Sequence, residues 1–255
     1  MIDLHCHLLP GLDDGPATIG DAVALAEDVL GAGIGTVVAT PHVSTRYAND
    51  PDGIEAARTA LRAELLGRGL ALEVLGGAEV DPRLIPDLAP DDLVRMHLGG
   101  GDTLLLECPF MQVAPWLEGM VDRLQADGHR VLLAHPERSP VLLRAPQLLE
   151  RLVAGGALVS LTGASLAGSF GSTARRFACW AIDSGCAHNV VTDAHGAHRP
   201  AILREALVEQ GYGWMADWLT DVAPSAILEG RSIPPAPPAP ARAPSRWGRL
   251  RKRVA

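Results

Sequence analysis

Short apolar runs alternate with longer amphipathic stretches along most of the chain. Seven runs of five to seven residues are rich in Val, Leu, Ala and Ile, and they lie at residues 1–7, 36–40, 73–79, 103–107, 131–135, 157–161 and 189–193. Most of them lack the strict alternation of a strand with one solvent-exposed face. They therefore indicate strands that are buried on both faces, as in a parallel sheet.

The stretches between these runs carry apolar residues at intervals of three and four, which predicts helices. The expected helices cover residues 16–30, 54–66, 113–126, 142–153, 174–183, 201–209 and 212–219. Several of them are followed by glycine, a common helix terminator. Residues 81–101 contain three prolines and a run of three glycines, and they are less regular. The alternation of strands and helices predicts an α/β fold with a parallel sheet.

Residues that commonly bind metals stand at the ends of six of the seven predicted strands. They are His7, His42, Glu79, Glu107, His135 and Asp193. The carboxyl ends of parallel strands meet at one rim when the strands form a barrel, and that rim holds the active site. A closed or nearly closed (β/α)7 barrel explains this placement better than an open sheet.

The first strand carries a second histidine, His5, two residues before His7. Side chains at i and i+2 of a strand point to the same side, so both imidazoles could bind one ion. Ile2, Leu4 and Cys6 would then face the other way, into the core. One such pair alone is as compatible with two structural histidines as with a metal site, and the other strand ends favour metal.

Nine residues make up the candidate metal centre, and they comprise five imidazoles and four carboxylates. They are His5, His7, Asp14, His42, Glu79, Glu107, His135, Asp193 and His195. This donor set suits manganese, zinc or iron and does not suit a metal that prefers thiolates. One ion does not need nine ligands, so two or three ions are expected, with a carboxylate bridging neighbours.

Charge divides the chain of 255 residues into an acidic body and a basic end. Residues 231–255 contain seven of the 22 basic residues and no acid, which leaves 15 basic against 30 acidic groups in residues 1–230. We expect residues 1–230 to form one domain and residues 231–255 to be a disordered Pro/Ala-rich linker with a basic tail. The acidic body argues against nucleic acid as a partner. The tail either solubilises the chain or contacts an anionic membrane surface or an acidic partner.

The four cysteines, Cys6, Cys108, Cys179 and Cys186, lack CxxC spacing and lie in apolar runs. This predicts buried, reduced thiols in a cytoplasmic protein. No cysteine has an arginine six residues later, so the phosphate-binding loop of cysteine-dependent phosphatases is absent. No run of 18 apolar residues is free of charge, so no membrane span is expected.

Several motifs resemble the PHP (polymerase and histidinol phosphatase) superfamily, over residues 1 to about 230. They are Met1-Ile-Asp-Leu-His-Cys-His-Leu-Leu-Pro-Gly-Leu-Asp-Asp-Gly15, Ala39-Thr-Pro-His42, Gly77-Ala-Glu79, Glu107-Cys-Pro109, Ala134-His-Pro-Glu-Arg138 and Thr192-Asp-Ala-His195. More narrowly, the chain resembles the bacterial tyrosine phosphatases that are encoded with capsule and exopolysaccharide genes. The first fifteen residues and His-Pro-Glu-Arg are the specific parts of the match.

The resemblance implies a distorted (β/α)7 barrel of the PHP type with a trinuclear site. Its first ion would be held by His5, His7, Glu79 and Asp193, its second by Glu79, Glu107 and His135, and its third by Asp14, His42 and His195. Arg138 would bind the phosphate through its planar guanidinium. Manganese is the first expectation for the metal, with iron, zinc and magnesium as alternatives.

The function that the resemblance implies is hydrolysis of a phosphotyrosine monoester by a metal-bound hydroxide. The substrate would be a bacterial tyrosine kinase that regulates capsular or exopolysaccharide synthesis, and the location would be cytoplasmic. His42, His195 or a water would protonate the leaving phenolate. Two departures concern substrate entry: Val43 stands where the family often has a second histidine, and Thr162-Gly163-Ala164 stands where it has asparagine.

Other functions of the chain, and purely structural roles for some of these residues, stay open at this point. The chain could be a small-molecule phosphatase for a substrate such as histidinol phosphate, a nuclease-like enzyme, or a catalytically idle scaffold, and an oligomer is not excluded. An amidohydrolase would usually need a bridging lysine, and Lys252 in the tail is the only one. Asp14 could instead cap a helix, and Arg138 could pair with Glu137 or another surface acid.

A few more residues near the motifs have weaker claims. Arg46 and Tyr47 lie in a loop where they could contact substrate or simply be solvated. The histidines outside the motifs, His97, His129, His188 and His198, are expected to be surface or core residues, although His198 lies close to His195.

Overall fold

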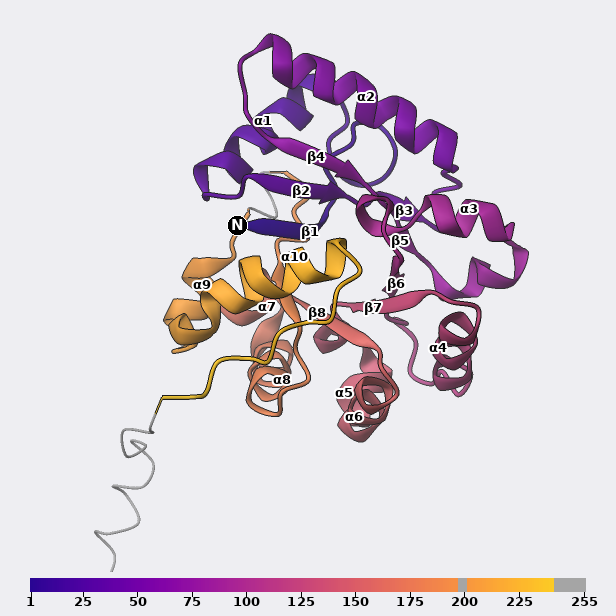
Figure 1. Ribbon diagram of the computed structural model, residues 1–255, viewed down its shortest axis with the longest axis vertical. Helices are drawn as coiled ribbons and strands as arrows, with labels where there is room; N and C mark the ends of the chain where they lie inside the picture. The colour runs from indigo at the N-terminus through magenta and orange to yellow at the C-terminus, as the bar shows by residue number, and fades with distance from the viewer. Residues whose placement is uncertain (197–200, 241–255) are drawn as a thin grey trace, which may run out of the picture.

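The computed structural model describes residues 1–196 and 201–240, which form an α/β fold with parallel strands (Figure 1). The described strands are β1 (Ile2–Cys6), β2 (Thr36–Ala39), β3 (His42–Val43), β4 (Glu73–Gly76), β5 (Glu79–Val80), β6 (Thr103–Glu107), β7 (Arg130–Ala134), β8 (Leu158–Thr162) and β9 (Asn189–Val191). They pair in the orders β1-β2-β4 and β3-β5-β6-β7-β8-β9, and every pair is parallel. The predicted parallel α/β class is therefore confirmed.

Two of the seven predicted strands are interrupted near their carboxyl ends. The run 36–40 becomes β2, and His42 then starts β3 after a break at Thr40 and Pro41. The run 73–79 becomes β4, and Glu79 starts β5 after Gly77 and Ala78. The second part of each run pairs in the larger sheet, where His42 lies opposite Glu79. Each break therefore places a predicted ligand at the start of a short strand instead of the end of a long one.

Backbone hydrogen bonds join β1 to the segment after β9. The amide of Asp193 donates to the carbonyl of His5 over 2.9 Å, and the amide of His7 donates to the carbonyl of Ala194 over 3.0 Å. Cys6 and Ala194 form a parallel bridge. The first and last strands of the described chain are thus neighbours, which brings their functional residues together.

Most of the helices lie on the outer side of the strands (Figure 1), whereas Ile227 of the last helix packs with the strand residues Leu4 and Leu105. The described helices are α1 (Ile19–Gly31), α2 (Pro51–Gly67), α3 (Pro90–Arg95), α4 (Leu117–Ala126), α5 (Pro140–Arg144), α6 (Pro146–Ala154), α7 (Gly163–Ala167), α8 (Gly171–Asp183), α9 (Arg204–Glu209) and α10 (Ala223–Leu228). None of the helices in the described part of the chain has the length and apolar character needed to cross a lipid bilayer.

Several predicted helix bounds were wrong, and local chemistry explains most of them. The first helix begins at Ile19 because Thr18 caps it: the Thr18 hydroxyl accepts from the Asp21 amide, and the Asp21 carboxylate accepts from the Thr18 amide. The predicted helix 142–153 is divided at Ala145, since the following proline cannot continue a helix. The predicted helix 212–219 is a 3-10 turn at Gly213–Met215 followed by a π-helix at Trp218–Val222. Helices α3 and α7 were not predicted.

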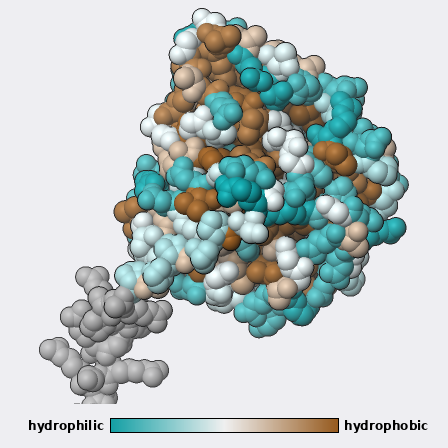
Figure 2. All heavy atoms as spheres, in the orientation of Figure 1, coloured by the Kyte–Doolittle hydropathy of each residue, from teal (hydrophilic) through white to brown (hydrophobic). Residues whose placement is uncertain are grey.

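Two groups of buried apolar side chains support the strands. The larger lies between the strands and the outer helices, whereas a smaller inner cluster combines strand residues with Leu98 and Ile227. The inner cluster consists of Leu4, Val38, Leu98, Leu105, Leu132, Ala134, Leu158, Val191 and Ile227. On the face seen in Figure 2, hydrophobic side chains at the surface are interspersed with hydrophilic ones.

The prediction that Ile2, Leu4 and Cys6 share one face was wrong. Leu4 belongs to the inner cluster, and Ile2 packs against it, but Cys6 belongs to the larger core. The cause is an irregularity in the β1–β2 pairing between Asp3 and Cys6, which changes the face on which later side chains fall.

The predicted linker begins close to the body. Ile233 packs against the core, and the Trp218 indole nitrogen donates to the carbonyl of Pro234 over 3.0 Å. Arg231 forms an ion pair with Glu229. The remaining basic residues of the tail lie outside the described residues, and so does His198.

Candidate metal centre

The structure brings all nine predicted ligand residues together from four strands and from the segments that follow β1, β7 and β9. Their nitrogen and oxygen atoms form four overlapping groups, each with its atoms within 4.8 Å of one another: His7, Asp14, His42 and His195; His5, His7 and Asp193; His5, Glu79 and His135; His42, Glu79 and Glu107. The overlaps connect the groups into one centre.

Four fully buried side chains form the inner group of this centre, namely His5, His7, Glu79 and Asp193. The Nε2 atoms of the two histidines are 3.1 Å apart. Glu79 Oε2 lies 3.3 Å and 3.4 Å from them, and Asp193 Oδ1 lies 3.5 Å and 3.3 Å away. Two ligands on one tetrahedral ion are about 3.4 Å apart when each bond is about 2.1 Å. These spacings therefore fit residues that share an ion.

Glu79 occupies the middle of the centre and contacts histidines through both of its oxygens. Oε1 lies 2.7 Å from His135 Nε2, and Oε2 lies 3.0 Å from His42 Nδ1. Oε2 is buried and accepts no hydrogen bond of good geometry, which is the situation of an atom suited to a cation. Burial alone would raise the pKa of Glu79, but the charges of His5 and His135 hold it well below its usual range. A carboxylate whose pKa is lowered in this way would offer both oxygens to cations.

Glu107 behaves in the opposite way, although it lies in one group with Glu79 and His42. Burial raises the pKa of Glu107 to about 7, and the negative charge of Glu79 contributes in the same direction. A carboxylate that ionises reluctantly beside another carboxylate indicates a place where a positive charge is needed.

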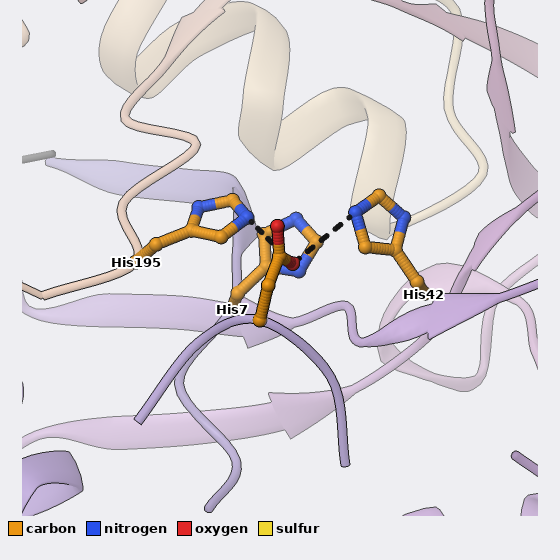
Figure 3. A group of neighbouring side chains, drawn as sticks. His7, His42 and His195 are labelled. Carbon is orange, nitrogen blue, oxygen red and sulfur yellow. Dashed lines mark ion pairs between the residues drawn. The ribbon is translucent and has the colours of Figure 1, made fainter. Parts of the chain in front are cut away.

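Asp14, His42 and His195 form the outer group, which converges with His7 (Figure 3). Asp14 Oδ1 lies 3.3 Å from His195 Nε2 and 3.6 Å from His42 Nε2. The His195 contact lowers the pKa of Asp14. Since Thr18 caps α1, the alternative role of Asp14 as that helix cap is wrong. Asp14 is the most open member, with 43% of its side chain exposed.

Backbone strain coincides with two of the predicted ligands. His135 has a φ of 35° and Asp193 a φ of 50°, and among the described residues they alone combine a side chain with a positive φ. His135 directly follows β7, and Asp193 lies two residues after the end of β9. Such conformations cost about 1–3 kcal/mol each and concentrate at functional sites, where the surroundings hold them.

Asp13 positions the centre and was not predicted as a site residue. Its Oδ2 lies 2.7 Å from His7 Nδ1 and accepts from the His42 amide over 3.0 Å, while Oδ1 accepts from the Gly15 amide over 2.9 Å. A carboxylate behind a ligating histidine fixes the ring and its tautomer. A Cβ on Gly15 would lie 2.5 Å from the His7 carbonyl oxygen, so only glycine allows this turn.

Asp3 is a second positioning residue that sequence reasoning missed. It is fully buried, and it accepts hydrogen bonds from the Thr192 hydroxyl and amide and from the His5 amide. Burial raises its pKa to about 6 despite these bonds. Asp3 thereby ties the backbone of His5 to the residue before Asp193. The signal in the sequence was a single acid in an apolar strand.

Arg138 lies at the edge of the inner group. Its Nη1 donates to Asp193 Oδ2 over 2.6 Å, and its guanidinium lies 4.3 Å from the ring of Phe170 and 5.4 Å from that of Phe110. The alternative pairing with Glu137 is wrong, because the Glu137 carboxylate accepts from the amide and hydroxyl of Thr162. Arg138 is therefore held where an anion above the centre would meet it.

The remaining candidates separate into those near the centre and those away from it. Tyr47 stacks on His42 with ring centroids 5.7 Å apart, and Arg46 lies 5.0 Å from the Tyr47 ring, so this loop adjoins the site. His97 and His129 contact each other over 2.8 Å, outside the centre. His188 Nδ1 accepts from the Val159 amide.

The four cysteines are free, and three of them are buried, whereas Cys179 is partly exposed. Burial raises the pKa of Cys6 and of Cys108 well above the usual value. Neither thiol can be a ready nucleophile, because the thiolate is the reactive form. The prediction of packed thiols is confirmed except at Cys179.

Comparison of the sequence with protein families and with known proteins found clear similarities. A family model described as capsular polysaccharide synthesis, CpsB/CapC, matches residues 1–214. Tyrosine-protein phosphatase YwqE from Bacillus subtilis is 33% identical over 248 residues, which cover 95% of this chain and 97% of YwqE.

Two solved structures have similar folds. One comes from work on YwqE from B. subtilis and CpsB from Streptococcus pneumoniae, described as metal-dependent tyrosine phosphatases, with a TM-score of 0.82 and 32% identity over 95% of this chain and 100% of the other. The other, a β-aspartyl dipeptidase from Fervidobacterium islandicum AW-1, has a TM-score of 0.57 and 13% identity over 89% of this chain and 72% of the other. The second likeness concerns the fold alone.

Proposed function

The chain belongs to the CpsB/CapC family of capsular polysaccharide synthesis, and we propose that it is a metal-dependent protein-tyrosine phosphatase. The observation that carries this proposal is the convergence of nine imidazoles and carboxylates around Glu79. A scaffold that only binds a partner would have no chemical reason to hold so many buried donors this close together, two of them with a strained backbone. The family membership then favours phosphotyrosine over other phosphate esters as the substrate.

We assign the donors to two or three divalent ions. His5, His7, Glu79 and Asp193 would hold the first, Glu79, Glu107 and His135 the second, and Asp14, His42 and His195 the third. The distances of the inner group support the first set, and the two-sided contacts of Glu79 support its bridging role. The donors are nitrogen and oxygen only, which suits manganese, zinc or iron. The resemblance makes manganese the first expectation among them and magnesium a further alternative.

The ions supply two things when bound: they lower the pKa of a water and neutralise phosphoryl oxygens. The residues of the chain do the remaining work. The Arg138 guanidinium pairs with Asp193 through Nη1, and its other N–H groups can donate to the phosphate oxygens. Asp13 holds the His7 ring, and Asp3 holds the backbone of His5. His42 and His195 are the candidates to donate a proton to the leaving phenolate oxygen, together with water.

The same proposal extends to the architecture and the setting. The two sheets would form one distorted (β/α)7 barrel, in which β2 with β3 and β4 with β5 are two interrupted strands. The hydrogen bonds between β1 and the end of β9 support this closure. The substrate would be a tyrosine kinase of polysaccharide assembly in the cytoplasm, where free thiols stay reduced.

Initial-rate hydrolysis tests the proposal. Metal-stripped protein is refilled with manganese, zinc, iron or magnesium and given a phosphotyrosine peptide or histidinol phosphate, alongside His135→Ala and the distant control His129→Ala. We expect metal to restore activity on the peptide, and we expect the control His129→Ala to retain that activity. His135→Ala should lower it more than about 100-fold, since even changes in residues that hydrogen-bond to metal ligands cost 10–100-fold. Activity confined to histidinol phosphate, or none with ions bound, would contradict the proposal.

A further inference from the structure

The loop that follows β6 presents an exposed aromatic ring at the edge of the metal centre. Phe110 stands three residues after Glu107 and is 51% exposed. Its ring centroid lies 5.7 Å from that of His135. Aromatic residues make up only 4% of the chain, so a half-exposed phenylalanine beside the candidate active site is unusual for this molecule.

Phe110 lines two hollows. The first has a volume of about 290 Å³ and extends from Glu107 along Phe110, Met111 and Trp116. Prolines Pro82 and Pro109 complete its apolar walls, and the ion pair of Arg83 with Asp81 lines it as well. This volume is at the lower end of ligand sites, which suits one side chain more than a whole small molecule.

The second hollow, of about 250 Å³, is lined by Phe110, Arg138, Leu143 and Phe170. The Arg138 guanidinium already lies against the Phe170 ring there, at 4.3 Å. Both hollows combine apolar walls with an arginine, and they differ in what that arginine adjoins. In the second, Arg138 lies beside the metal centre, whereas in the first Arg83 is paired with Asp81 and the walls begin at the candidate ligand Glu107.

We propose that the first hollow binds the phenyl ring of the phosphotyrosyl side chain and that Phe110 is the residue that selects aryl over alkyl phosphates. This inference rests on the proposed phosphatase function. In a phenyl phosphate a single ester oxygen separates phosphorus from the ring, so the ring must lie directly beside the atoms that hold the phosphate. The hollow at Glu107 offers the walls of Phe110, Met111 and Trp116 in that position, and a flat ring gains both burial and stacking against Phe110.

A short alkyl phosphate would hold its phosphate in the same place and leave the hollow without an apolar occupant. The preference for aryl groups that depends on Phe110 should be about tenfold, which corresponds to about 1.4 kcal/mol. This lies at the upper end of what an aromatic pair contributes beyond the area that it buries.

Direct binding of phosphonates, which are not hydrolysed, measures this preference. Calorimetry gives the Kd of phenylphosphonate and of methylphosphonate for manganese-loaded protein, in the parent chain and in Phe110→Ala, Phe110→Leu, Phe170→Leu and Val113→Ala. Val113 is the matched control because it lies in the same loop, is 70% exposed and lines neither hollow. The exposed position of Phe110 predicts nearly unchanged unfolding temperatures, which are checked for each variant.

The ratio is the Kd of methylphosphonate divided by the Kd of phenylphosphonate, so it measures the preference for the aryl group. We expect Phe110→Ala to reduce this ratio about tenfold and Phe110→Leu about threefold, because leucine restores apolar contact without a flat face. The ratio should change less than about twofold in Val113→Ala. An unchanged ratio in Phe110→Ala would overturn the inference. A ratio that falls in Phe170→Leu but not in Phe110→Leu would also overturn it, since the ring would then occupy the second hollow.

Hydrolysis of phenyl phosphate, measured on the same preparations, separates this inference from the proposed function. Phosphonate binding that depends on Phe110 without any hydrolysis would overturn the phosphatase and leave the aryl site standing. Hydrolysis by a parent chain whose aryl preference is independent of Phe110 would support the phosphatase and overturn the aryl site alone.

Discussion

The inner and outer groups of the centre use the same residue types in different surroundings. In the inner group, the side chains of His5, His7, Glu79 and Asp193 are at most 2% exposed. In the outer group, 43% of the Asp14 side chain and 16% of the His42 side chain are exposed. Buried charges are costly unless they are paired or bind a cation, whereas exposed charges are screened by water. The inner group therefore has the stronger physical reason to bind an ion permanently.

The two groups also differ in how the chain holds them. Inner residues stand on strands or directly after them, and the buried Asp3 joins β1 to the segment of Asp193. Asp14 comes from the loop after β1, where Asp13 and Gly15 set the turn. Sites on regular elements are more precise than sites on loops. We expect a tight inner ion and a more readily exchanged outer ion.

The largest effect should follow from Glu79→Gln, which keeps the shape of the side chain and removes its charge. Glu79 contacts both the inner histidines and His135, so the change would weaken two of the proposed ion sites at once. We expect hydrolysis of a phosphotyrosine peptide to fall more than about 1,000-fold, beyond the 10²–10³ that one electrostatic contact is worth. The exposed Glu118→Gln serves as the control. More than a tenth of the parent activity in Glu79→Gln would contradict the central place of this residue.

Asp14→Asn should have a smaller effect, because it touches the outer group alone. We expect the peptide hydrolysis rate to fall about 100-fold, the order of one lost electrostatic contact, while the tightly bound metal content stays unchanged. Metal analysis after dialysis measures the second quantity, and Asp28→Asn on α1 is the control. Loss of all bound metal in Asp14→Asn would mean that the two groups are not distinct.

Asp13→Asn tests the positioning of both groups and should cost less again. The amide keeps the size of the side chain but weakens the contact with His7 Nδ1. Changes behind a ligating histidine typically cost 10–100-fold in metal affinity, and we expect about tenfold here. The rise in Kd for manganese, measured by calorimetry, is the readout, because a role in folding alone would leave the metal affinity of the folded protein unchanged.

The smallest predicted effect is a change in the pH dependence of folding stability, which we assign to Glu107. The metal-free fold raises the pKa of Glu107 from 4.5 to about 7. The folded state therefore holds this proton more tightly than the unfolded state, and the resulting stability is complete below pH 4.5 and is lost as the pH rises through about 7. A bound cation needs the ionised carboxylate, so it reverses the sign.

The rise in unfolding temperature that manganese causes should accordingly grow between about pH 5.5 and 7.5. Thermal unfolding with and without manganese measures it, and Glu107→Gln should flatten the part of the pH dependence that belongs to this group. A manganese-induced rise that shrinks over this range would show that Glu107 does not bind the ion as a carboxylate.

The sequence was sufficient to predict the parallel α/β class and the convergence of all nine candidate ligands, because strand ends and ligand residues coincide along the chain. It was not sufficient for features that depend on three-dimensional neighbours. Asp13 differs from Asp14 only in the direction of its side chain, and Asp3 gains its role only when Thr192 lies beside it. The partner of Arg138 was likewise invisible, since Asp193 is 55 residues away.

The irregularities escaped prediction for a related reason. The break after β2, the shifted face of Cys6 and the positive φ of His135 all arise where the backbone turns toward the centre. Local propensity favours a regular strand at each of these positions, and the surrounding structure overrides it. These departures from regular geometry lie at the candidate site.

Titration of manganese into metal-stripped protein, followed by calorimetry, tests the difference between the two groups most directly. The parent chain and Asp14→Asn are compared under the same conditions. We expect two classes of site in the parent chain, with the tighter class retained and the weaker class lost in Asp14→Asn. A single class of site that Asp14→Asn weakens as a whole, or no binding to the folded parent chain, would contradict the account.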